Sequence, residues 1–148
     1  MVNSKDLKIG NLVKFKKGDG TICKIDSIYR NTVDVNLGDG LIKRGCSLDS
    51  IEGVKFNRQV MKNIGFRFSE VLGLFEGTLM ILCEPGDYED SLYHNAIIYI
   101  NRDMLLSIEF SNEEGEVAMI SMPKIQTLHQ LQNLQYDLNK EELIYTEI

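Results

Sequence analysis

Side chains that can move a proton near neutral pH are scarce in this sequence, which contains two histidines, His94 and His129. Any histidine-based acid–base catalysis or metal binding must therefore use one of them. His94 stands between an acidic segment and a predicted strand, and His129 stands beside an apolar helical stripe. No Gly-x-Ser-x-Gly elbow, which would carry a serine nucleophile, occurs in the sequence. We therefore predict no catalytic residue, and an enzyme with an unrecognised site that uses His94 or an acidic residue in a pocket stays open as an alternative.

Residues that can bind metals are present, but not in metal-binding patterns. The three cysteines, Cys23, Cys46 and Cys83, form no Cys-x-x-Cys pair and have no histidine at ligand spacing, so we expect reduced, mostly buried thiols. The acidic segment 84–90 offers oxygen ligands but lacks the aspartate spacing of an EF-hand loop, so we interpret it as a solvated turn. A charged hairpin tip is expected at Glu113, Glu114 and Glu116. The sequence predicts no metal and no cofactor.

Two Gly-Asp-Gly triplets, at 18–20 and 38–40, are the clearest local signals in the chain. Glycine adopts positive φ without steric cost and aspartate caps its own turn, so each triplet between apolar runs predicts a β-hairpin. Both triplets are followed by predicted strands, whereas a phosphate-binding loop is followed by a helix. The triplets therefore indicate fold and exclude a nucleotide loop of that kind.

A group of basic side chains in the first third of the chain is the one candidate binding site. Strand alternation could gather them on one positive face that contacts phosphates. Exposed aromatic rings for base stacking are few, and lysines also occur on the polar side of edge strands, where they discourage aggregation. The predicted anion or nucleic-acid contacts are Lys14, Lys16, Lys17, Lys24, Lys43 and Arg44.

These side chains are positioned by a predicted small barrel in residues 1–56. Alternating apolar residues predict strands at 11–16, 21–28, 32–37 and 41–46. Alternation fails within the second of these, which indicates a bulge or bend. Ser47 is expected to cap a short helical turn through Ile51. Four short strands in so few residues favour an SH3-like barrel.

Residues 57–148 are expected to form a second, α+β segment, and the sequence leaves open whether the two segments pack as one unit. Asn57 is a predicted N-cap for a helix that ends at Asn63, with Gly65 as the stop signal. Thr127 and Gln130 predict a capping box for a helix through Asn139 that lies on one face of an antiparallel meander. The meander strands are expected at 66–71, 74–83, 94–100, 104–110 and 117–122. The predicted fold class is α+β and β-rich.

Charge divides between the two segments. Residues 1–56 contain ten Lys or Arg against seven Asp or Glu, a net +3, and residues 57–148 contain six against fifteen, a net −9. Such a division suggests either a basic module for an anionic partner or two segments that attract each other. The preferred interpretation is a solvated mixed surface with some internal pairing.

Composition places few other limits on the chain. The 148 residues are 43% hydrophobic and 26% charged, as in ordinary globular proteins. The first residues lack the apolar core of a signal peptide, and no run approaches the roughly 20 apolar residues of a membrane helix. We therefore expect a cytoplasmic protein that does not use a membrane.

Two short motifs resemble a group of small uncharacterised bacterial and prophage-type proteins. The first is Leu-Lys-Ile-Gly-Asn-Leu-Val at 7–13 and the second is His-Gln-Leu-Gln-Asn-Leu at 129–134. In that group the first motif opens a barrel-like segment and the second begins a terminal helix, so the resemblance implies the same arrangement here. It implies no activity.

Two classes of function follow from these patterns. The preferred hypothesis is a non-enzymatic protein-interaction module that binds a protein partner or itself. The alternative is association with nucleic acid through the basic residues, which predicts binding that weakens as salt rises. The leucine stripe of the last helix could cover the sheet or pair with a second chain, so the sequence leaves the oligomeric state open.

Overall fold

The structure is a computed structural model, and it describes residues 2–69, 74–80, 95–111, 116–140 and 142–146. The chain divides into two compact units. The first comprises Met1–Lys55 and Thr127–Asn133, and the second comprises Phe56–Gln126 and Leu134–Ile148. Each unit is built around one antiparallel five-stranded sheet. The predicted α+β, strand-rich class is therefore confirmed.

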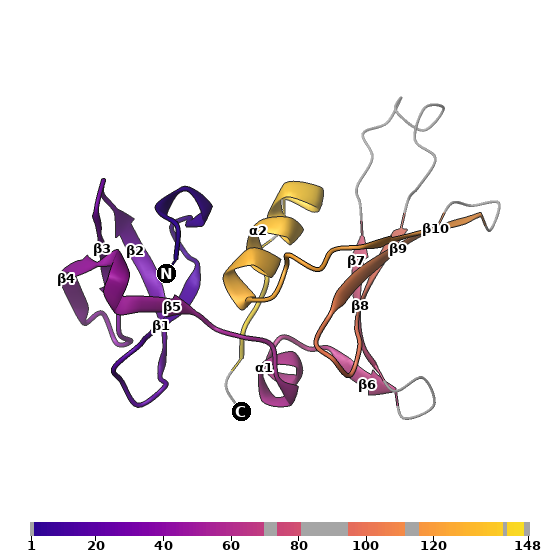
Figure 1. The fold of residues 1–148 in the computed structure, drawn as a ribbon, viewed down its shortest axis with the longest axis horizontal. Coiled ribbons are helices and arrows are strands. Elements are labelled where there is room, and N and C mark those ends of the chain that lie inside the picture. The colour runs from indigo at the N-terminus through magenta and orange to yellow at the C-terminus, as the bar shows by residue number, and fades with distance from the viewer. Residues whose placement is uncertain (1, 70–73, 81–94, 112–115, 141, 147–148) are drawn as a thin grey trace. The chain divides into compact units, whose positions relative to one another are not determined.

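The first unit contains a sheet in the order β4-β3-β2-β1-β5 (Figure 1). Two 3₁₀ turns, Ser4–Asp6 and Leu48–Ser50, accompany it. The strands are β1 (Leu12–Phe15), β2 (Ile22–Ile28), β3 (Thr32–Asn36), β4 (Ile42–Ser47) and β5 (Ile51–Gly53).

Two local predictions for this sheet are confirmed. The register between β2 and β3 shifts between Ile25 and Ser27, which is the irregularity that the failed alternation predicted. Ser47 caps the second 3₁₀ turn, and its hydroxyl accepts a hydrogen bond from the Asp49 backbone N–H at 3.2 Å. Strand β5 was not predicted, because three residues that follow a turn carry too little periodicity to be recognised.

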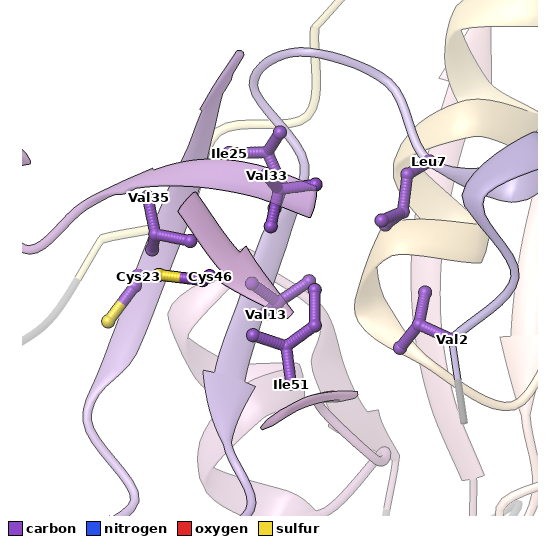
Figure 2. Close-up of a cluster of buried hydrophobic side chains, with 9 residues drawn as sticks. All are labelled: Val2, Leu7, Val13, Cys23, Ile25, Val33, Val35, Cys46 and Ile51. Atoms are coloured by element: carbon purple, nitrogen blue, oxygen red, sulfur yellow. The ribbon is translucent and has the colours of Figure 1, made fainter. Parts of the chain in front are cut away.

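The core of the first unit lies on one face of its sheet (Figure 2). β-branched side chains at alternating positions of β1, β2 and β3 point to the same face because successive strand residues point to opposite faces. The Cys23 and Cys46 thiols are free and buried, as predicted. The buried cluster comprises Val2, Leu7, Val13, Cys23, Ile25, Val33, Val35, Cys46 and Ile51.

This first sheet is open in the described residues. β4 and β5 are its two edges, and no pairing joins them there. The prediction of a small antiparallel β unit is confirmed, whereas the finer SH3-like description stays a prediction.

The second unit is the predicted antiparallel meander, in the order β10-β9-β8-β7-β6. Helix α1 (Arg58–Asn63) precedes it, and the Asn57 side chain accepts a hydrogen bond from the Val60 N–H at 2.9 Å, so the predicted cap is confirmed. Gly65 adopts φ 83°, as expected of a helix stop. The remaining elements are β6 (Arg67–Ser69), β7 (Leu74–Met80), β8 (Asn95–Ile100), β9 (Leu106–Ser111), β10 (Val117–Ser121) and α2 (Leu128–Asn139).

The start of α2 differs in part from the prediction. Gln130 completes its half of the capping box by accepting a hydrogen bond from the Thr127 N–H at 3.1 Å. The expected position on the meander does not hold for Thr127–Asn133, which belong to the first unit. There the Leu128 N–H donates to the Val54 carbonyl at 2.8 Å. The correction has a physical cause, because this half of the helix carries polar side chains that bind the backbone of the first unit.

Several predicted features lie outside the described residues. They are His94, Cys83, the acidic segment 84–90, and Glu113 and Glu114 of the predicted hairpin tip.

Candidate functional site

The six predicted anion contacts all lie in the first unit, but they do not share one environment. Two of them pair with carboxylates: the Lys14 ammonium lies 3.3 Å from Glu52, and the Arg44 guanidinium lies 3.5 Å from Asp34. Lys24 is exposed between buried Cys23 and Ile25 on β2, so its side chain points to the opposite face of the sheet from the core.

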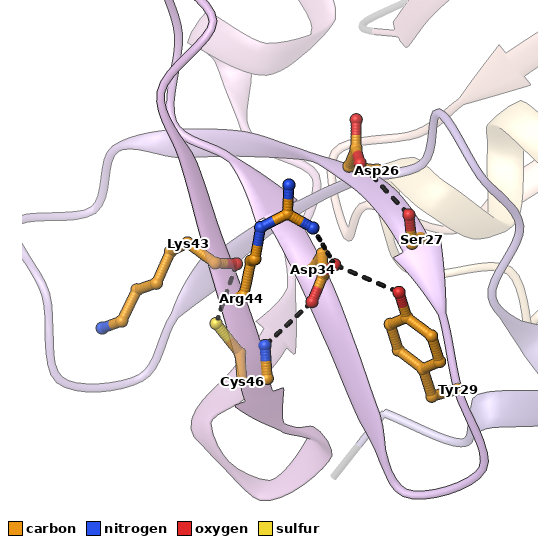
Figure 3. Close-up of polar contacts among 8 residues, drawn as sticks. Asp26, Ser27, Tyr29, Asp34, Lys43, Arg44 and Cys46 are labelled. Atoms are coloured by element: carbon orange, nitrogen blue, oxygen red, sulfur yellow. Dashed lines mark hydrogen bonds and ion pairs between the residues drawn. The ribbon is translucent and has the colours of Figure 1, made fainter.

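The Asp34 carboxylate on β3 holds β4 in place by a hydrogen bond to its backbone (Figure 3). This buried carboxylate accepts hydrogen bonds from the Gly45 N–H at 2.8 Å, the Tyr29 hydroxyl at 3.3 Å and Arg44 at 3.5 Å. Gly45 has φ 64°, a left-handed conformation that suits glycine, and the register between β3 and β4 shifts beside it. Arg44 therefore has a structural partner.

The other three basic residues, Lys16, Lys17 and Lys43, line a groove of about 430 Å³ together with Phe15. Lys43 reaches this groove because it is paired with Val35, whose side chain faces the core. Its ammonium lies 4.8 Å from the centre of the Phe15 ring, within cation–π range. Figure 3 shows the Lys43 side chain extending away from the Arg44–Asp34 contact.

The rim of the groove is fixed by short hydrogen bonds around the second 3₁₀ turn. The Lys16 backbone N–H donates to the Ser50 carbonyl at 3.0 Å, and the Ser50 hydroxyl donates to the Ser47 carbonyl at 2.6 Å. Asp49 adds one carboxylate to the lining. The lysine side chains are exposed, and the groove combines an aromatic floor with an excess of positive charge. We call this groove the Phe15 groove; its lining residues are Phe15, Lys16, Lys17, Lys43, Ser47, Asp49 and Ser50.

The two motifs at 7–13 and 129–134 contact each other in the first unit. Gln132 is buried, and its side chain accepts a hydrogen bond from the Leu12 N–H at 2.8 Å and donates one to the Gly10 carbonyl at 3.2 Å. Asn133 accepts from the Asn11 amide at 2.9 Å and donates to the Asp6 carbonyl at 2.7 Å. Residues about 120 positions apart in sequence are thus joined by paired amide hydrogen bonds.

His129 belongs to the same junction, where it is 5% exposed. Its Nδ1 atom lies 3.1 Å from the Thr127 hydroxyl, and burial lowers the pKa of its ring below 6.5. A Cβ atom on Gly53 would lie 2.9 Å from the His129 Cε1 atom and 2.7 Å from the Thr127 Cγ2 atom. Glycine at this position therefore permits the helix to approach β5 closely. Sequence analysis missed this role of His129 because it depends on contacts distant in sequence.

The second unit has a different kind of surface, the outer edge of β10. This strand is the last of its sheet and pairs only with β9 among the described residues (Figure 1). Val117, Met119 and Ile120 are 58%, 59% and 51% exposed. Pairing of Met119 with Glu109 and of Ile120 with Ile108 places these side chains on opposite faces of the sheet. β10 is thus an apolar edge that is exposed on both faces.

Comparison of the chain with protein-family models, with curated proteins and with solved structures finds no match. None of the helices in the described ranges is long and apolar enough to span a membrane. In the same ranges, no three His, Cys, Asp or Glu side chains gather where they could hold a metal ion.

Proposed function

We propose that this chain is a non-enzymatic protein-interaction module that assembles by strand addition at the outer edge of β10, with a second copy of itself as the occupant. The observation that carries the proposal is the exposed apolar edge of β10. An edge strand presents unpaired N–H and C=O groups, which makes it a template for another strand.

The other sheet edges in the described part of the chain carry features that oppose strand addition, and β10 lacks them. β4 carries Lys43, Arg44 and a register shift, and β5 and β6 are only three residues long. β10 has the sequence Val-Ala-Met-Ile-Ser, with no charge, proline or glycine. Charges, bulges and short edge strands are the devices by which proteins prevent edge pairing.

A second copy fits this edge because β10 is its own complement in an antiparallel pair. With Met119 at the centre, Met119 lies opposite its counterpart, Ala118 lies opposite Ile120, and Val117 lies opposite Ser121. Side chains that point to the same face meet in each case, because the pleat repeats every two residues. Such a two-fold contact closes on itself and gives a dimer.

The charges that flank β10 also favour the antiparallel arrangement. Glu116 precedes the strand and Lys124 follows it. Antiparallel pairing brings the acidic end of one copy toward the basic end of the other, whereas parallel pairing brings like charges together. Five residues per copy form a small interface, so we expect weak, concentration-dependent association.

The test is sedimentation equilibrium from about 1 μM to about 1 mM, a range that covers weak interfaces. The wild-type protein is expected to associate, and Met119→Lys is expected to abolish association because two ammonium groups would face each other at the centre. A mixture of Met119→Lys and Met119→Glu is expected to recover it as a heterodimer. Ile144→Lys is the matched control, because Ile144 is 75% exposed and is not part of β10.

Two results would overturn the proposal. One is a wild-type protein that stays monomeric across this range. The other is association that survives Met119→Lys while the far-ultraviolet circular dichroism of the variant matches the wild type.

Finer assignments belong to the same proposal. We propose that the first unit is an SH3-like module and that the chain belongs with the bacterial and prophage-type group. The five short antiparallel strands and the contact between the motifs at 7–13 and 129–134 support these assignments. The free, buried Cys23 and Cys46 thiols support a reducing, cytoplasmic location.

A further inference from the structure

We propose that the Phe15 groove binds an acidic, extended segment of a partner protein. This inference goes beyond assembly through β10, since it concerns the other unit and a different kind of ligand. It rests on the shape, charge and chemistry of the groove.

The groove has an apolar floor and a positive rim. Phe15 is half-buried and packs against the core cluster, so its ring is held in place while one part of it faces the groove. Lysine side chains contribute aliphatic stems as well as charge, because the stem can lie on apolar surface while the ammonium stays in water. An alternating acidic and apolar peptide complements this pattern.

Charge around the groove favours an anionic ligand. Lys16, Lys17 and Lys43 supply three ammonium groups against the single Asp49 carboxylate. Within the described part of the chain, these three lysines form no ion pair, in contrast to Lys14 and Arg44. The first unit as a whole also carries a net +3. Carboxylates that enter the groove therefore find cations without displacing another carboxylate.

An acidic peptide fits the groove better than nucleic acid does. Base stacking needs open aromatic faces, and the groove offers one ring, over which Lys43 already lies at 4.8 Å from the centre. A nucleic-acid backbone also needs a continuous row of cations. Here the row is interrupted, because Lys14 and Arg44 have carboxylate partners and Lys24 points to the other face.

The experiment measures binding of a short peptide with alternating glutamate and leucine residues by isothermal titration calorimetry with the full chain. The Lys16→Gln/Lys17→Gln/Lys43→Gln variant is expected to weaken binding about tenfold, because exposed charge contacts contribute only modestly each. Lys24→Gln is the matched control and is expected to bind like the wild type. Raising salt is expected to weaken binding.

Three further outcomes would each overturn the inference. The first is no binding of the acidic peptide at all. The second is equal binding of a peptide in which glutamine replaces every glutamate. The third is tighter binding of a single-stranded oligonucleotide through the same lysines, which would instead assign the groove to nucleic acid. The three lysines are exposed, so their substitution is expected to leave the fold intact.

Discussion

Gln132 is a buried polar side chain on α2 that binds the backbone of a segment about 120 residues earlier in the sequence. Its amide satisfies a backbone donor and a backbone acceptor of the motif at 7–13, and the bond from the Leu12 N–H is buried. A buried polar group without a partner costs far more than a typical hydrogen bond contributes. The motifs at 7–13 and 129–134 therefore have a physical role, which is to dock the start of α2 on β1.

We predict that Gln132→Ala lowers the free energy of unfolding by about 2 kcal/mol, because it leaves the buried Leu12 N–H without its acceptor. Urea denaturation measures this change. Gln135→Ala is the control on the same helix and is expected to change stability by less than about 1 kcal/mol, because Gln135 is half-buried and not fully buried like Gln132. Equal effects of the two substitutions would contradict the role given to Gln132.

His129 gives the junction a pH dependence. Burial lowers its pKa in the folded protein below 6.5, so near and below that pH the unfolded chain binds a proton more readily than the folded one. Above about pH 6.5 the ring is neutral in both the folded and the unfolded chain, and its full contribution to stability is present. This contribution is lost as the pH falls through the lowered pKa. Asp6 opposes the shift, and Glu52 and Lys55 line the same hollow.

We therefore predict that the wild type loses more stability between pH 7 and pH 5.5 than His129→Gln does. Carboxylates shared by both proteins titrate equally, so the difference between the two urea titrations isolates His129. Identical pH dependence in the two proteins would show that the ring is not protected from protonation.

Asp34 and Arg44 form an ion pair, and we expect the two residues to contribute unequally to the stability of the protein. We predict that Asp34→Ala destabilises the protein by about 2 kcal/mol, because the Gly45 N–H and the Tyr29 hydroxyl lose the buried carboxylate that accepts their hydrogen bonds. Arg44→Ala is expected to cost less than about 0.5 kcal/mol, since its side chain is 76% exposed. Thermal or urea unfolding of both variants checks this order, and a larger cost for Arg44→Ala would contradict it.

At the scale of elements, the features that depend on residues close together in the sequence were predictable from the sequence. The Asn57 cap, the Ser47 cap and the bulge in β2 each depend on residues within a few positions of one another, and all three are present. The meander order was predictable because each connection joins neighbouring strands. β5 was not, since its three residues gain their strand conformation from pairing with β1.

Candidate sites were less predictable than strands because they depend on side-chain partners. The sequence predicted the same role for Lys14, Arg44 and Lys43, but Glu52 and Asp34 pair with the first two and the third lies over Phe15. The bulge at Gly45 rotates β4 between Lys43 and Cys46, and no periodicity in the sequence reveals it. The apolar edge of β10 was visible as a strand, but its exposure required the sheet order.

At the scale of the whole molecule, charge separates the two proposed interactions. The chain has a net charge of −6, so two copies repel each other and added salt is expected to strengthen association through β10. Binding of an acidic peptide in the Phe15 groove is expected to weaken under the same conditions. The two responses have opposite sign, so one salt series distinguishes the two surfaces.

The central claim is that β10 pairs with β10 of a second copy, and hydrogen exchange detected by mass spectrometry tests it most directly. The outward N–H groups of an unpaired edge exchange readily, whereas a new strand ladder protects them. We predict that protection of residues 117–121 rises with protein concentration in the wild type and stays constant in Met119→Lys. Exchange of these residues that does not change with concentration, in a sample shown to be associated, would contradict the account.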